Sequence, residues 1–147
     1  ITQQMVKNYF LTPERTLKRK INEFFISLVL EQSTSKDKIL ETYLNIIYLG
    51  QSGSYQVRGF PSASEHYFQR PIEDLDLSQC ATLAAVLNNP RIYDPFKNSE
   101  RAIQRRNLVL ERMNQVGFIS ESEKLTAQGM ALQLRLRPNI GDTSPYY

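Results

Sequence analysis

Cysteine and histidine are scarce in this sequence, and so are long apolar runs. One cysteine and one histidine occur among 147 residues. His66 has no second histidine with which to share a metal site, so we expect a partly buried helix residue. Cys80 begins an apolar run over residues 80–87, which favours a small buried thiol over a reactive one. No stretch is apolar and long enough to span a bilayer.

The remaining composition is that of a folded domain with one core. Hydrophobic residues make up 41% of the chain and charged residues 22%. The net charge is only +3, but basic residues crowd the first quarter of the chain. Such a patch suits phosphates or an anionic membrane surface. Its members are Lys7, Arg15, Lys18, Arg19, Lys20, Lys36 and Lys38.

Apolar periodicity and capping residues predict a series of helices. A first element begins near the start of the chain. Further helices are expected over residues 12–32, 36–48, 62–68, 78–88, 99–116 and 120–130. The expected N-caps are Thr12, Ser35, Ser62, Ser78 and Ser120, and Gly50 is the expected stop of the second of these helices. The sequence therefore predicts an all-α domain over residues 1–131, with the buried centre at 78–88.

The period changes after residue 131. Leucine alternates with polar residues over 132–137, which predicts a strand. One strand cannot pair with itself, so residues 132–147 are expected to be a strand-like linker toward a following domain.

The most informative charges lie on the helix over residues 12–32. Arg19, Lys20 and Glu23 are three or four residues apart and can share one side of that helix. One interpretation is a solvated face with ordinary ion pairs, which contribute little to stability. The other is a pyrophosphate site, in which fixed cations bind phosphate and the carboxylate orients them or helps to hold a metal.

Four segments in order carry a more specific pattern. They are TQQMVKN at residues 2–8, RKINE at 19–23, KDKILETYLN at 36–45 and RGFPSAS at 58–64. Together they resemble the peptidoglycan glycosyltransferase domain of class A penicillin-binding proteins, glycosyltransferase family 51, in its 1B-type form. The resemblance covers nearly the whole chain and implies a lysozyme-like helical fold.

The family's reaction is polymerisation of lipid II into glycan strands with release of undecaprenyl pyrophosphate. It needs a general base and positive charge for the leaving group. The resemblance makes Glu23 a second carboxylate, which orients cations or holds Mg²⁺ or Mn²⁺. It implies structural roles for Glu41, Tyr43 and Arg58, with Glu41 pairing with Arg58. The implied substrate-binding residues are Gln4, Lys7, Asn8, Arg19, Lys20, Asn45 and Asn88.

The resemblance also implies partners and a location. The expected partners are lipid II, the growing glycan chain, the membrane surface, cell-wall synthesis proteins and inhibitors of the moenomycin type, but no nucleic acid. The expected location is the periplasmic face of the bacterial inner membrane, through an upstream anchor.

Two departures from the family pattern matter. The first motif, Glu-Asp-x-x-Phe, which carries the general base, is absent, so we expect residues 1–147 to be inactive on their own. Asn88 stands where many members carry a lysine, so a substrate contact there would be a neutral hydrogen bond.

Three questions stay open on the sequence alone. A lysozyme-like hydrolase would need a second acid near Glu23 and would cut glycan. A nucleic-acid-binding domain would need basic residues on a recognition helix. A group of apolar residues could face lipid or fill the core: Tyr9, Phe10, Leu11, Leu17, Ile21, Phe24 and Phe25.

Overall fold

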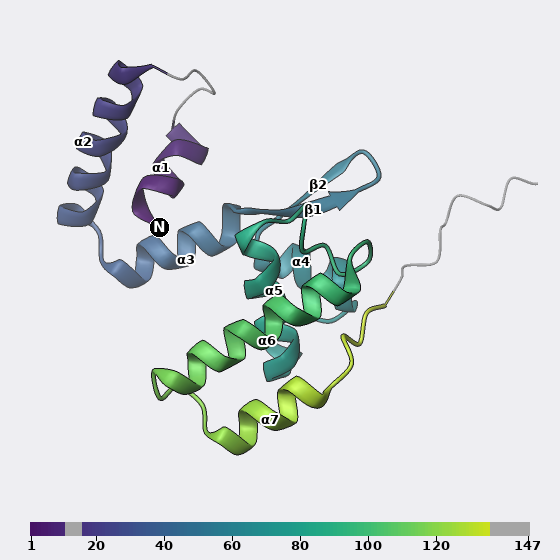
Figure 1. Ribbon diagram of the computed structural model, residues 1–147. Coiled ribbons are helices and arrows are strands. Elements are labelled where there is room, and N and C mark those ends of the chain that lie inside the picture. Colours follow the sequence, from purple (N-terminus) through teal and green to yellow (C-terminus); the bar gives the residue numbers. More distant parts are fainter. Residues whose placement is uncertain (11–15, 136–147) are drawn as a thin grey trace, which may run out of the picture.

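A computed structural model describes residues 1–10 and 16–135, without the side chains of residues 8–10. This part is helical apart from one small hairpin, so the all-α prediction is confirmed with that addition. Figure 1 shows α1 and α2 on one side of the molecule, and α3 connects them to the remaining elements. The elements are α1 (Thr2–Phe10), α2 (Leu17–Ser33), α3 (Lys36–Ile46), β1 (Tyr48–Ser52), β2 (Tyr55–Arg58), α4 (Phe60–Phe68), a short 3₁₀ turn (Ile72–Asp74), α5 (Leu77–Asn88), α6 (Ser99–Gln115) and α7 (Glu121–Gly129).

Helix α5 is the buried centre, as predicted. Small and aliphatic residues along it are buried, and it packs against α4, α6, α7 and β1. The predicted cap at Ser78 is wrong: Asp76 is the N-cap, and its carboxylate accepts the Gln79 N–H at 2.8 Å. Ser78 is instead buried and accepts a hydrogen bond from Arg106. Cys80 is exposed, because it lies on the solvent side of the helix, so its predicted burial is also wrong.

The β-hairpin is the element that sequence patterns missed. Helix α3 ends at Ile46 instead of Tyr48, because Tyr48 pairs with Arg58 at the start of antiparallel strands β1 and β2. Gly50 lies inside β1 and is no helix stop. Its φ is +154°, and a Cβ there would meet the hydroxyl of Tyr67 at 2.5 Å, so glycine fits the space. That hydroxyl donates to the Leu49 carbonyl at 2.9 Å and fixes the hairpin onto α4.

Two helix starts differ from their predictions. Helix α2 begins at Leu17 with Thr16 as its N-cap, and the predicted cap Thr12 lies outside the described residues. Helix α4 begins at Phe60 after Gly59, so Ser62 is not its cap. A positive φ of +80° at Gly59 allows this early turn.

The C-terminal half agrees with the sequence until residue 131. Ser35 and Ser120 cap α3 and α7 as predicted, and α6 ends one residue before its predicted end. Residues 132–135 form no strand, so the strand prediction is wrong for the part described. Leu132 is buried, and the Arg135 N–H donates to the Tyr67 carbonyl, so these residues pack along α4.

Candidate functional site

Helix α2 presents an unusual distribution of side chains. Its buried residues are Glu23 and Ser27, one turn apart, and the helix packs against α1. Most of its large apolar side chains are exposed instead, although Ile26 and Leu30 are partly buried and Leu30 packs against a core cluster. Leu17, Ile21, Phe24 and Phe25, whose position in the core or toward lipid the sequence left open, therefore do not fill the core of the described part of the chain. The exposed fractions are 79% for Leu17, 49% for Ile21, 54% for Phe24, 58% for Phe25, 43% for Leu28 and 62% for Val29.

Glu23 and Lys20 form the centre of the site. The Lys20 ammonium lies 3.1 Å from Oε1 and 3.2 Å from Oε2 of Glu23, so it contacts both carboxylate oxygens. The Glu23 side chain is 5% exposed, whereas that of Lys20 is 60% exposed. Lys20 can therefore meet a ligand from solvent while a buried carboxylate fixes its position. The buried Ser27 hydroxyl donates to the Glu23 carbonyl at 2.7 Å, so it finds its partner one turn earlier on the same helix.

The predicted site residues on α1 lie beside this helix. Gln4 is exposed, and its Oε1 accepts a hydrogen bond from the buried Tyr43 hydroxyl at 3.2 Å. Burial raises the pKa of Tyr43, so the hydroxyl stays protonated and donates. Lys7 is exposed near the end of α1, and the side chain of Asn8 lies outside the described residues. Arg19 is half-buried in the first turn of α2.

The predicted pair between Glu41 and Arg58 does not form. Glu41 accepts from Lys38 at 2.8 Å on its own helix, and the Arg58 Nε donates to Gln56 at 2.9 Å along the same strand, β2. Both residues are exposed, and each is bonded to a neighbour on its own element. Asn45 is exposed as well, and its amide donates to the Glu41 carbonyl at 3.0 Å.

Asn88 ends α5 and is joined to an arginine that we did not predict as a site residue. The Arg105 Nη2 donates to the Asn88 Oδ1 at 2.8 Å. The preceding residue, Leu87, packs against the core cluster of Met5, Ile39 and Tyr43. The end of α5 therefore connects the α1–α3 cluster with α6. In the sequence, Arg105 stands out only because it directly precedes a second arginine, Arg106, and this does not mark it as a site residue.

The described residues do not by themselves fit a resident metal ion. Both oxygens of Glu23 already face the Lys20 ammonium, which repels a cation. Within residues 1–10 and 16–135, no three acidic, histidine or cysteine side chains come together as a metal site. His66 is partly buried against the rings of Tyr67 and Phe96, as predicted.

Comparisons with known proteins identify the family. The family model described as Transglycosylase matches residues 1–114. The chain belongs to the transglycosylase family. Penicillin-binding protein 1B of Escherichia coli is 45% identical over 137 residues, which are 92% of this chain and 16% of that protein. Penicillin-binding protein 1B of Haemophilus influenzae is 50% identical over 113 residues, which are 77% of this chain and 14% of that protein.

A solved structure has the same fold. The crystal structure of penicillin-binding protein 1A from Haemophilus influenzae matches with a TM-score of 0.63 and 33% identity, over 74% of this chain and 16% of that chain. The transglycosylase chain thus spans about a sixth of the length of the relatives it matches. The matched residues 1–114 contain every predicted site residue.

Proposed function

We propose that this transglycosylase chain contributes the leaving-group site of a peptidoglycan glycosyltransferase. In that role it binds the pyrophosphate of lipid II and of the growing glycan chain. The hydroxyl of one disaccharide attacks the anomeric carbon of the other chain, and the undecaprenyl pyrophosphate leaves. Cations fixed beside the pyrophosphate stabilise the negative charge that develops on it.

The geometry of Lys20 and Glu23 carries this proposal. A buried carboxylate whose two oxygens hold an exposed ammonium fixes the position of that ammonium and leaves one of its three N–H donors for a ligand from solvent. Arg19 in the same turn and Lys7 on the adjacent α1 would add charge, and Gln4 and Asn8 would add neutral donors. Inhibitors of the moenomycin type carry a phosphate as well and would bind the same cations.

A divalent cation is a separate proposal. Glu23 would supply one ligand to Mg²⁺ or Mn²⁺, and phosphate oxygens of the substrate would supply others. Lys20 would have to move away from Glu23 first, so we assign the cation no step in the reaction.

The exposed apolar face of α2 supports contact with a membrane surface. None of the helices within the described residues is apolar and long enough to cross a bilayer. A helix of this kind can instead insert its apolar side chains at the interface. We propose that the site lies at the periplasmic face of the inner membrane, where lipid II would reach it together with partner proteins of cell-wall synthesis.

Binding of farnesyl pyrophosphate to residues 1–147 tests the leaving-group site without requiring turnover. Affinity should fall as NaCl is raised, because screening weakens contacts between cations and phosphates. Lys20→Gln and Arg19→Ala should each weaken binding by about tenfold, the effect of losing one charge-assisted hydrogen bond. Arg112→Gln, an exposed arginine of α6, is the control and should bind as the wild type does. Equal binding of farnesol, which lacks the pyrophosphate, would contradict the proposal.

The comparisons give no support to a hydrolase or a nucleic-acid-binding domain. Salt-sensitive binding of duplex DNA, or release of cut glycan, would be the observation that brings either function back.

A further inference from the structure

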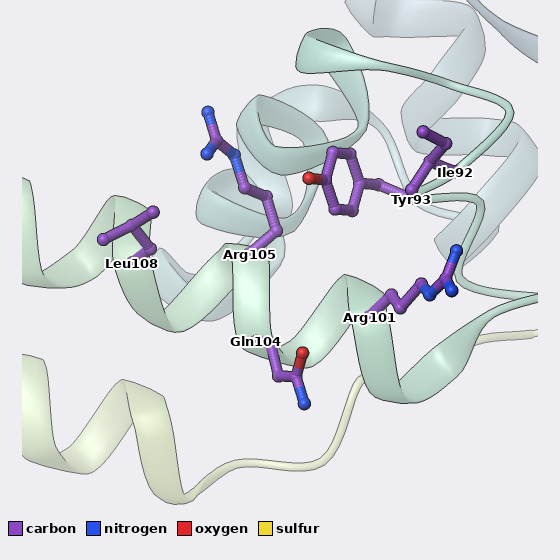
Figure 2. Close-up of a pocket in the computed structure, with 6 residues that line it drawn as sticks. All are labelled: Ile92, Tyr93, Arg101, Gln104, Arg105 and Leu108. Atoms are coloured by element: carbon purple, nitrogen blue, oxygen red, sulfur yellow. The ribbon is translucent and has the colours of Figure 1, made fainter.

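The segment at the end of α7, residues 130–135, is held by contacts with several other elements. It runs from α7 toward α4 in Figure 1, and Figure 2 shows it in pale yellow as it leaves α7 and passes below α6. Its start is fixed by Arg106, which donates to the Met130 carbonyl at 2.7 Å. Its middle is fixed by Gln133, whose side-chain amide donates to the Asp76 carboxylate at 3.2 Å.

The end of this segment completes α4 with its backbone. The Arg135 N–H donates to the Tyr67 carbonyl at 3.0 Å, and the Gln69 side-chain amide donates to the Arg135 carbonyl at 3.4 Å. Tyr67 lies in the last turn of α4, where carbonyl groups find no donor within their own helix. The segment therefore supplies a donor that α4 itself cannot supply. Leu134 packs beside it, against the core cluster that contains Tyr67.

The other end of Tyr67 holds the β-hairpin. Its hydroxyl donates to the Leu49 carbonyl of β1 at 2.9 Å. Burial raises the pKa of Tyr67, so the hydroxyl stays protonated and keeps its role as donor. One fully buried residue thus binds the segment after α7 through its backbone and the hairpin through its side chain.

The segment is kept in place by these contacts and not by its own backbone preference. Gln133 has a φ of +54°, in the left-handed region that residues other than glycine seldom adopt. Such a conformation persists only where the surrounding contacts impose it. A segment held in this way is released when its contacts are lost.

We infer that residues 130–135 form a strap that keeps the β-hairpin fixed on α4, with Tyr67 as the link between them. Tension on the chain beyond Arg135, or a partner bound to it, would free the Tyr67 carbonyl and loosen the hold of its hydroxyl on β1. The effect would extend to α3, because Ile47 joins α3 to the hairpin and packs against both of the core clusters on its two sides. This strap is independent of the proposed pyrophosphate site.

Two changes at one position test the backbone bond of the strap. Arg135→Pro removes the N–H donor, whereas Arg135→Ala keeps it and is the matched control. NMR of the 147-residue chain with labelled tyrosines measures how fast the buried rings flip. We expect the Tyr67 ring to flip about tenfold faster in Arg135→Pro than in Arg135→Ala, the scale of one lost hydrogen bond. The ring of Tyr43, which is buried in the other cluster, should flip at the same rate in both.

Amide hydrogen exchange tests the link to the hairpin. Arg135→Pro should accelerate exchange of the β1 and β2 amides about tenfold relative to Arg135→Ala. In a Tyr67→Phe background, which lacks the hydroxyl bond to Leu49, the same comparison should give less than about a twofold difference.

Unchanged flipping of the Tyr67 ring in Arg135→Pro would overturn the inference. Equal acceleration of the Tyr43 ring would overturn it as well, because it would show a loosening of the whole fold. Hairpin exchange that accelerates by the same factor with and without the Tyr67 hydroxyl would contradict the role of Tyr67 as the link. The ring-flip comparison needs no change at Tyr67, so it decides even if Tyr67→Phe does not fold.

Discussion

Helices α2 and α5 use their side chains in opposite ways. Helix α5 buries Ala81, Leu83, Ala85 and Val86 in the middle of the domain. Helix α2 is longer, yet its only fully buried residues are Glu23 and Ser27, and most of its apolar side chains are exposed, with Leu30 partly buried against a core cluster. Because apolar burial is the main source of stability, α5 holds the fold together. We propose that the exposed side chains of α2 serve contact with ligands instead.

Truncating a leucine in each helix should give the largest difference between them. Leu83→Ala in α5 should reduce the free energy of unfolding by about 2–5 kcal/mol, because it opens a cavity in the core. Leu28→Ala in α2 should cost about 1 kcal/mol or less, since 43% of Leu28 is already exposed. Urea unfolding followed by circular dichroism measures both. Similar losses would mean that α2 is part of the core.

Two of the buried charged residues, Arg106 and Glu23, sharpen the comparison. Arg106 on α6 is 1% exposed and donates to the Ser78 hydroxyl and to the carbonyls of Gln128 and Met130. Burial lowers its pKa, with Asp76 acting in the opposite direction. Arg106→Leu should cost about 2–4 kcal/mol, because it leaves those acceptors unpaired. Glu23→Gln should cost about 1 kcal/mol or less, because its partner Lys20 reaches solvent. The same urea experiment decides, and a larger loss for Glu23→Gln would reverse the assignment.

The exposed phenylalanines of α2 should affect membrane binding and not folding. We expect the double change Phe24→Ser and Phe25→Ser to weaken binding to phosphatidylglycerol vesicles by at least about tenfold, because burial of even one aromatic side chain contributes about 1.5–3 kcal/mol. Phe118→Ser is the matched control, since Phe118 is 80% exposed but follows α6. Vesicle sedimentation measures the effect. Equal weakening by the control would mean that the binding is unspecific.

Acidic pH should have the smallest effect on stability, and that effect should arise at the start of α7 and not in α2. The N–H and hydroxyl of Ser120 both donate to Glu123 at 2.7 Å, and these bonds lower the pKa of Glu123 below its ordinary value of 4.5. A carboxylate with a lowered folded-state pKa stabilises the fold above its ordinary pKa, and this stabilisation is lost as pH falls through the lowered value. Urea midpoints should therefore decrease slightly below pH 4.5, and Glu123→Gln should remove part of that decrease. Identical pH profiles would contradict this origin.

Sequence reasoning worked best where a local signal controls the structure. The Ser120 cap is followed by Glu123 at the spacing of a capping box, and both bonds of that box form. The helical core at residues 78–88 was predictable because it is apolar nearly all round. The position of Glu23 and Lys20 on one side of a helix followed from their separation alone.

Features that depend on distant partners could not be predicted in this way. The hairpin requires Tyr48 to pair with Arg58, and it requires Gly50 to leave room for the Tyr67 hydroxyl, which donates to the Leu49 carbonyl. No local sequence pattern predicts either contact. Residues 132–135 alternate like a strand but find the surface of α4 instead of a strand partner. The contact of Arg105 with Asn88 joins two helices, so only the fold brings it about.

Lipid II polymerisation by a full-length protein that contains this chain tests the central claim most directly. We predict that Glu23→Gln lowers the rate about a hundredfold, the scale of losing one positioned charge contact, while the melting temperature stays close to that of the wild type. Glu31→Gln changes an exposed carboxylate of the same helix and should leave the rate unchanged. A Glu23→Gln protein that polymerises lipid II within a few-fold of the wild type would contradict the account.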